Sequence, residues 1–413
     1  MQLSTSEKIL IYSSKINLSA NELAQLNERL TSASSVTIHS ASSATIPSAS
    51  SVTIHSTSSA FYIRLAQLLV KRGIAPMLYA KRELLAVWAD TPETFRFAIE
   101  SAYSSTLMRS MVLYNAFAEL LTAAAALPQA PVIIPLKGVY LSEWLYTDIA
   151  LRMFSDIDIL VKPQDAEVVL ELLRKLGYKE SKSPGVSEFT DRHEEIVHYL
   201  PMVRGSVSVE VHIKLHRSSK HYAINTAAVI ESSYKSTLHG LSVHAMELHD
   251  LLIHTCVHID KHFRGGNLSF RSFTDLVNLL EVHSSALNWE YLLQRCELHK
   301  CTNVVMSYIV LVSEFYNVAL PAAITTKYSR LVTESDKKLF LHYLHGGKLQ
   351  PSQVNSHLNN ISNIKELRTK IIYLWEIIFP SRAFIKSKFR LKNNDSVWFY
   401  YFYRWWLGIK GIF

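Results

Sequence analysis

Cysteine is scarce in this sequence, since only Cys256, Cys296 and Cys301 occur among 413 residues. So few cysteines exclude a disulfide framework and fit a reducing compartment, and we therefore expect a cytoplasmic protein. Charged residues are also few, at 19% against about 25% in average proteins. Because 48% of the residues are hydrophobic, the chain can bury a large core, and global disorder is excluded.

Long hydrophobic runs are absent as well. No stretch of about 18 uncharged apolar residues occurs, which argues against a membrane-spanning helix. Residues 1–19 lack a basic region followed by a clean apolar stretch, so we expect no signal peptide. The length of the chain suggests two or three domains.

Positive charge is concentrated at the C-terminal end. The net charge is +8, and residues 365–413 contain ten basic and three acidic residues, which leaves the rest of the chain nearly neutral. Residues 397–413 also hold nine aromatic residues. We predict that these rings dock on the preceding helical domain. Two alternatives stay open: contact of residues 382–413 with a membrane surface, and binding of nucleic acid or a protein partner.

A serine-rich octapeptide repeat occupies residues 32–60, in the copies SASSVTIH, SASSATIP and SASSVTIH followed by STSSA. It lacks charge and has few bulky apolar residues, which favours a solvated, variable insertion. A short β-solenoid is the alternative, because V-T-I alternates, but three copies are few for a stacked core. We assign the repeat no function.

The spacing of apolar residues divides the chain into three regions. Helical spacing of apolar residues predicts helices before Pro128, with a stop at Gly73. Short apolar runs at 131–136 and 154–161 and a strict alternation at 206–216 predict strands interleaved with helices. Helical patterns return after about residue 240. The predicted regions are 1–125, 126–240 and 241–413.

Two aspartates in the segment FSDIDILV are the strongest chemical signal. On a strand, Asp156 and Asp158 would point the same way, with Cα atoms about 6.5–7 Å apart. Neighbouring carboxylates repel each other unless a cation lies between them, and Mg²⁺ prefers such oxygen ligands. A lone D-x-D pattern can equally be two solvated acids at a strand end.

The surrounding residues favour a site for a phosphate and a metal. Lys137 and Gly138 lie between a predicted strand and a helix, where free N–H groups and the helix dipole attract phosphate. Arg152 precedes the acidic strand. The alternation at 206–216 places Glu210 and His212 on the face opposite the valines, so Glu210 could supply a third carboxylate. Two-metal phosphoryl or nucleotidyl transfer requires such a set of groups.

The chain resembles the uncharacterised bacterial nucleotidyltransferases of the DNA-polymerase-β-like superfamily. The resemblance rests on L-K-G at 136–138, a helix, then R-x-x-x-D-I-D-I-L-V at 152–161 and the acid-x-His strand at 210–212. More weakly, it includes H-x-x-x-H-x-x-x-H, R-S-F-T-D-L and Asn288-Trp289, and it covers roughly residues 60–300. Two departures matter: Gly138-Val139 replaces the usual Gly-Ser, and Glu210 replaces the commoner Asp.

The resemblance implies an α+β fold, with a small mixed-sheet nucleotidyltransferase unit between helical regions. It also implies an enzyme that transfers a nucleoside monophosphate from an NTP to an acceptor hydroxyl, with Mg²⁺ or alternatively Mn²⁺. Under this hypothesis Asp156, Asp158 and Glu210 hold the metal and are the catalytic residues. The nucleotide would be bound by Lys137, Gly138, Arg152 and Ser155. The acceptor could be a protein, a peptide, RNA or a small molecule.

Three histidines, His254, His258 and His262, fall at i, i+4 and i+8 on one helical stripe. Three readings stay open for them: packed or surface residues, contacts to acceptor or nucleotide, and a metal site. We name His212, His258 and His262 as candidate substrate contacts, and expect Asp275 to be a helix-packing or capping residue. A different class of function also stays open, namely a catalytically silent scaffold that acts through its basic aromatic C-terminus.

Overall fold

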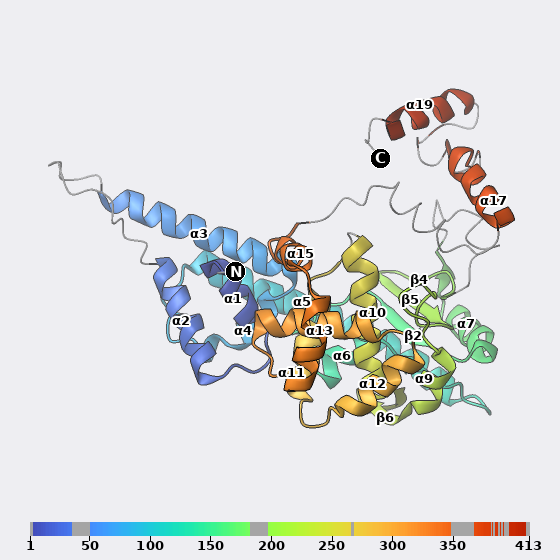
Figure 1. The fold of residues 1–413 in the computed structure, drawn as a ribbon, viewed down its shortest axis with the longest axis horizontal. Helices are drawn as coiled ribbons and strands as arrows, with labels where there is room; N and C mark the ends of the chain where they lie inside the picture. Colours follow the sequence, from blue (N-terminus) through green and yellow to red (C-terminus); the bar gives the residue numbers. More distant parts are fainter. Residues whose placement is uncertain are drawn as a thin grey trace.

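Helices build both ends of the chain, and a small sheet lies between them in sequence (Figure 1). The computed structural model describes residues 3–34, 50–181, 197–265, 268–347, 367–380, 382, 385–386, 389, 391 and 396–409. The α+β class predicted from the resemblance is confirmed. Side chains from Ile9 to Leu344 form one apolar core across all three predicted regions, whose boundaries stay a prediction.

The N-terminal part is built of helices that pack around one long helix, α5. Its elements are α1 (Thr5–Ser13), α2 (Ala20–Ser34), α3 (Ser50–Arg72), α4 (Ala75–Ala80) and α5 (Glu93–Ala125). Helix α1 begins with a capping box between Ser4 and Glu7. Helix α3 ends, as predicted, at Gly73, whose φ of +72° is one that L side chains rarely adopt. With 33 residues, α5 is about 50 Å long, and it packs on α3 and α4 at one end and on the sheet unit at the other.

A five-stranded mixed sheet forms the central unit, in the strand order β1-β2-β5-β4-β3. Its strands are β1 (Ile134–Pro135), β2 (Ile157–Leu160), β3 (Lys179–Glu180), β4 (Met202–Arg204) and β5 (Val207–His212). Strands β2 and β5 are parallel neighbours, and every other pair is antiparallel. Helix α6 (Lys137–Trp144) follows β1, and α7 (Ala166–Lys175) packs against β5.

A separate hairpin, β6 (Tyr234–Leu238) and β7 (Leu241–Ala245), lies beside β1. Its two turn residues, His239 and Gly240, both have positive φ, at 51° and 75°, which is the conformation of a type I′ turn. The N–H of His244 donates to the carbonyl of Ile133, which ties the hairpin to the chain leading into β1.

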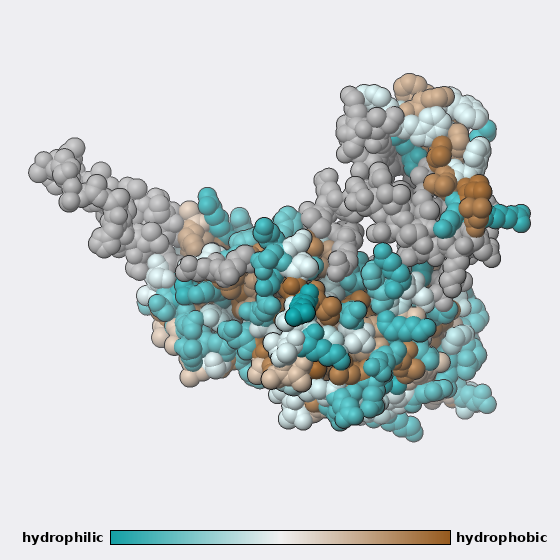
Figure 2. All heavy atoms as spheres, in the orientation of Figure 1, coloured by the Kyte–Doolittle hydropathy of each residue, from teal (hydrophilic) through white to brown (hydrophobic). Residues whose placement is uncertain are grey.

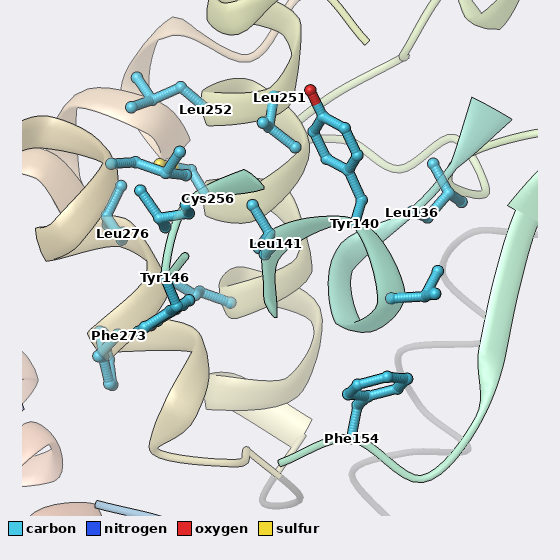
Figure 3. Close-up of a cluster of buried hydrophobic side chains, with 14 of the residues drawn as sticks. Leu136, Tyr140, Leu141, Tyr146, Phe154, Leu251, Leu252, Cys256, Phe273 and Leu276 are labelled. Atoms are coloured by element: carbon cyan, nitrogen blue, oxygen red, sulfur yellow. The ribbon is translucent and has the colours of Figure 1, made fainter. Parts of the chain in front are cut away.

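The second helical part packs around α10, which carries the histidine stripe. Its elements are α9 (Thr226–Ser232), α10 (Leu248–Gly265), α11 (Arg271–Val282), α12 (Trp289–Leu298), α13 (Thr302–Tyr316), α14 (Ala322–Tyr328) and α15 (Glu334–Leu344). Figure 3 shows Tyr140 and Leu141 of α6 in one cluster of buried side chains with Leu251 and Cys256 of α10. This shared apolar core fixes the start of α6 relative to α10 and α11, and so positions the site described below.

The predicted strands are shorter in the structure, for identifiable reasons. The alternation over 206–216 predicted one strand, but β5 ends at His212 because the N–H groups of Ile213 and Lys214 both donate to the carbonyl of Val197. Strand β1 has only two residues, the second of them Pro135, which has no N–H to extend a ladder. Asp156 directly precedes β2 instead of lying on it.

The last copy of the octapeptide repeat is helical where it is described. Helix α3 begins at Ser50, so residues 50–60 are neither a β-solenoid nor a loop. Residues 35–49, which hold most of the first two copies, lie outside the described part of the chain.

Helices α17 (Leu367–Ile378) and α19 (Trp398–Ile409) are set apart from the other helices (Figure 1). Tyr401 of α19 packs with Ile385 and Val397, which lie between the two helices, in a small separate core, and none of the three belongs to the main core. The predicted docking of the terminal rings into the helical domain is therefore wrong for the described residues. No described helix has both the length and the apolar character needed to cross a bilayer.

Candidate active site

A polar cavity of about 350 Å³ opens where β2, β5 and the start of α6 face α10 and α11. Its volume is within the range of about 300–1,000 Å³ typical of small-ligand sites. Every residue that the sequence predicted for the site lines this cavity. They are Lys137, Gly138, Arg152, Ser155, Asp156, Asp158, Glu210, His212, His258 and His262.

Asp158 and Glu210 come together because of the register between β2 and β5. Asp158 lies directly opposite Glu210 on the parallel neighbour, so both side chains project from the same face of the sheet. The flanking residues Ile157 and Ile159 are fully buried on the other face. Asp156 approaches from the turn before β2 and also lines the cavity.

Lys137 contacts Asp158 and has a strained backbone conformation. Its φ of 40° is uncommon for a residue with a side chain, and such strain collects at functional sites. Its ammonium group lies 3.1 Å from Oδ2 of Asp158, whose side chain is only 9% exposed. Burial opposes ionisation of Asp158, but the charge of Lys137 and a hydrogen bond with His212 hold the pKa of this carboxyl well below its usual value. Asp158 is therefore ionised at neutral pH.

Asp156 has the opposite electrostatic character. Burial and the nearby charges of Asp158 and Glu210 raise the pKa of its carboxyl, although Lys137 and the Ser155 hydroxyl counteract this. The Ser155 Oγ donates to Oδ1 of Asp156 at 3.2 Å. Neighbouring carboxyls whose pKa values shift in opposite directions are typical of a functional site.

Gly138 is required by close packing rather than by its backbone angles. A Cβ atom at this position would lie 2.7 Å from Cβ of Phe154, which is closer than real side chains approach. Phe154 in turn packs edge-on against Tyr114 of α5. The glycine therefore lets the first turn of α6 approach the segment that leads to Asp156, and its helix N-terminus faces the cavity.

The donor atoms fit a divalent cation. One ligand atom from each of Asp158, Glu210 and His212 lies within 4.8 Å of the others, and this is the only such group of three within the described ranges. His212 belongs to this group and Asp156 does not, while the assignment of Asp156 to the metal stays a prediction. Two carboxylates and one imidazole suit Mn²⁺ as well as Mg²⁺. His212 is buried, but its hydrogen bonds to Asp158 and Glu210 raise the pKa of the imidazole.

Arg152 has a structural partner that the sequence did not predict. Its Nε and Nη2 donate to the two carboxylate oxygens of Asp275 at 2.8 and 2.7 Å, and the Tyr146 hydroxyl donates to the same carboxylate at 2.8 Å. Asp275 is a buried residue of α11, in keeping with the expected helix-packing role, and it also pairs with a buried arginine from a distant part of the chain. Arg152 contacts the cavity with its guanidinium already held by α11.

The histidine stripe of α10 divides into an inner and an outer part. His254 is buried, and its Nδ1 lies 3.0 Å from Nε2 of His216, whereas His258 and His262 line the cavity with ring centroids 4.4 Å apart. Burial lowers the pKa of His258 well below its usual value and that of His262 to about 4, so both are neutral at neutral pH. Among the described residues the stripe forms no cluster of three metal ligands.

Two cations in the cavity were not singled out from the sequence. Lys261 of α10 and Arg271, the first residue of α11, line the wall opposite the acids. A signal for each was present: Lys261 lies three residues after His258 and so on the same helical face, and Arg271 opens the R-S-F-T-D-L segment. Burial lowers the pKa of both side chains, and for Lys261 the charge of Lys137 adds to this effect.

Comparisons with known proteins agree with this geometry at the level of the family. Residues 62–317 match the sequence model of a family described as uncharacterised nucleotidyltransferase. No curated protein and no solved structure gave a match. The matched range contains the whole sheet unit and helices α10 to α13, and thus every residue of the cavity. The chain therefore belongs to this family of nucleotidyltransferases.

Proposed function

We propose that the protein transfers a nucleoside monophosphate from an NTP to an acceptor hydroxyl in a reaction that requires a divalent cation. The observation that carries this proposal is the convergence of Asp156, Asp158 and Glu210 with Lys137 at the start of α6, all in one cavity. Family membership supports nucleotidyl transfer in general. The substrate, the metal and the mechanism are proposed here.

Each side chain has a role that follows from its position. Asp158 and Glu210, with His212 beside them, would hold Mg²⁺ or Mn²⁺, because their ligand atoms already lie within one ion's reach. The cation would neutralise charge on the triphosphate and on the departing pyrophosphate. Lys137 and the N–H groups at the start of α6 would bind phosphate oxygens, and Lys261 and Arg271 would bind them from the opposite wall.

Asp156 is the group best suited to take the acceptor's proton. It lines the cavity with Asp158, Glu210 and His212 but is outside their group of ligand atoms, and burial and the two nearby acids raise the pKa of its carboxyl. In the proposed reaction the acceptor oxygen forms a bond to the α-phosphorus, the bond to pyrophosphate breaks, and the acceptor's proton passes to a carboxylate oxygen of Asp156. Arg152 would steady this segment through Asp275, with Ser155 as the remaining predicted contact to the nucleotide.

The test is label transfer from each of the four α-³²P-labelled NTPs, with cell lysate as the source of acceptor, with and without Mg²⁺ or Mn²⁺. We expect one NTP to label an acceptor only when the cation is present, and Glu210→Gln to abolish the labelling. Mn²⁺ binding measured by electron paramagnetic resonance gives a second readout, and should weaken at least tenfold in Glu210→Gln. Absence of labelling with all four NTPs would count against the proposal.

The alternative of a catalytically silent scaffold makes a different prediction. A scaffold has no need to keep its acids together, and separated acids would favour it. Here Asp158 and Glu210 face each other across β2 and β5, which supports the enzyme. Intact Mn²⁺ binding without any label transfer would favour the scaffold instead.

A further inference from the structure

Helix α17 exposes a continuous apolar stripe. Its large apolar side chains at i, i+4, i+7, i+8 and i+11 share one face of the helix and are between 42% and 73% exposed, namely Leu367, Ile371, Leu374, Trp375 and Ile378. Exposed apolar residues are ordinary when they are scattered, but a row of five on one helical face indicates an interaction surface.

Helix α19 exposes a second stripe, made of aromatic rings. The side chains at i, i+1, i+4, i+5 and i+8 are between 39% and 67% exposed, namely Trp398, Phe399, Phe402, Tyr403 and Trp406. Phe399 stacks on Tyr403, and Tyr403 stacks on Trp406. The space-filling view shows hydrophobic side chains at the surface of the α17 and α19 region (Figure 2).

These exposed stripes are not the faces through which α17 and α19 contact each other. The two helices already share an inner face, where Tyr401 donates to the carbonyl of Pro380 at 2.5 Å and Trp405 donates to the carbonyl of Ile378 at 2.8 Å. The small core around Tyr401 lies on this inner face. The exposed stripes are therefore additional apolar surface, left over after the pair has packed on itself.

Basic residues accompany the exposed apolar stripes of α17 and α19. Residues 365–413 carry ten basic and three acidic residues, and among the described ones the exposed Arg368 lies on α17 while Arg382 lies over the ring of Trp398, 5.9 Å from its centroid. Each helix has twelve residues and is about 18 Å long, too short to cross a hydrocarbon core of about 30 Å. Short helices with an aromatic-rich apolar face and basic neighbours lie in the plane of an anionic membrane surface.

We propose that α17 and α19 form a membrane-binding hairpin that attaches the protein to bilayers containing anionic lipids. The aliphatic stripe of α17 favours a membrane over RNA as the partner, because leucine and isoleucine insert between acyl chains but do not stack on bases. A second copy of the chain is disfavoured as the partner, since two segments of the same strong positive charge would repel each other.

Vesicle co-sedimentation of the full chain tests the proposal. We expect binding to vesicles of phosphatidylcholine and phosphatidylglycerol in equal parts, weak binding to phosphatidylcholine alone, and loss of binding at high salt. The double variant Ile371→Ser/Phe402→Ser should lower the partition coefficient at least tenfold. Neutralising Arg368 and Lys370 together should lower it roughly twenty-fivefold, at roughly fivefold for each basic residue. The matched control is Phe97→Ser, a 70% exposed apolar residue on α5, which should bind like the wild type.

Three outcomes would overturn the proposal. One is failure of the wild type to bind the anionic vesicles at low salt, and another is an equal loss of binding in Phe97→Ser and in the double variant. The third is that the wild type binds no vesicles but binds single-stranded RNA, or forms a dimer detected by light scattering. In that case the double variant should abolish the RNA binding or the dimer. A chain truncated after residue 396 should keep the melting temperature of the main body and lose vesicle binding, because none of the described residues beyond it belongs to the main core.

Discussion

Arg152 and Asp275 are 123 positions apart in the chain and form a bidentate ion pair that is almost completely buried, with side chains 10% and 4% exposed. The pair joins the segment before the acidic strand to the first turns of α11. Burial disfavours the charged guanidinium, yet the charge of Asp275 raises the pKa of Arg152, so the arginine stays charged. The ion pair therefore holds the segment before β2 against α11 at one side of the cavity.

Asp275→Asn should strongly destabilise the protein. The substitution keeps the shape of the side chain but leaves a buried guanidinium without a counter-charge, which costs about 3–5 kcal/mol of the free energy of unfolding. Urea unfolding followed by circular dichroism measures this cost. The control is Glu167→Gln, which breaks a surface ion pair with Arg174 and should change stability by less than about 1 kcal/mol. Equal effects of the two variants would show that the buried pair contributes no more than the surface pair.

Asp156→Asn should abolish cation-dependent nucleotidyl transfer and leave the thermal melt unchanged or slightly raised. The pKa of Asp156 is raised above its ordinary value of 3.8 by burial, Asp158 and Glu210, so its ionised form is disfavoured in the folded state. That penalty is fully present above the folded-state pKa and is lost as the pH falls below the unfolded value, because the group is then protonated in both states. Any gain in melting temperature should therefore be seen at pH 7 and be absent at pH 3. A large loss of stability would mark Asp156 as structural.

Gly138→Ala should damage both the cavity and the fold. The new Cβ would lie 2.7 Å from Cβ of Phe154, a backbone-linked atom that cannot rotate away, so the start of α6 must shift. We expect a loss of about 1–3 kcal/mol of stability and a clear loss of nucleotide binding. Gly240→Ala is the control, because its φ of +75° strains a turn outside the cavity and no atom lies near its Cβ. It should lower stability while the folded fraction binds nucleotide normally.

Local patterns in the sequence predicted which side chains face the site, but they did not predict contacts between residues far apart in the chain. The alternation of valines at 207, 209 and 211 fixed which face of β5 is buried, and this placed Glu210 and His212 on the same side as Asp158. No local pattern could show that Arg152 meets Asp275, because that pairing depends on how α11 packs on the sheet unit. The end of β5 was missed for the same reason, since it depends on Val197 of a distant segment.

Lys81 should make stability rise with pH above neutrality. It is a fully buried lysine whose ammonium donates to the carbonyls of Ser13 and Met77, and burial lowers its pKa to about 7 from 10.5. Between these values the unfolded chain binds the proton and the folded chain does not, so stability increases with pH, by up to a few kcal/mol. Urea unfolding at pH 7, 8 and 9 should show this slope, and Lys81→Met should remove it. The exposed Lys179, changed to Met, should leave the slope intact.

Lys261 and Arg271 should bind the nucleotide's phosphates from the wall opposite the acids. Lys261→Met and Arg271→Met each remove one positive charge from the cavity while keeping an unbranched stem, and a lost hydrogen bond to a charged group costs about 1.5–3 kcal/mol. The KM for the NTP should therefore rise at least tenfold in each variant. If the contacts form equally in the ground state and the transition state, kcat should stay within a few-fold of the wild type.

The control is Lys220→Met, an exposed lysine that does not line the cavity and should leave KM unchanged. Because the Arg271 stem packs over Gly73, its variant is compared only after its melting temperature has been measured. An unchanged KM in a folded Lys261→Met protein would show that Lys261 of α10 does not bind the nucleotide, and would leave phosphate binding to Lys137 and the start of α6.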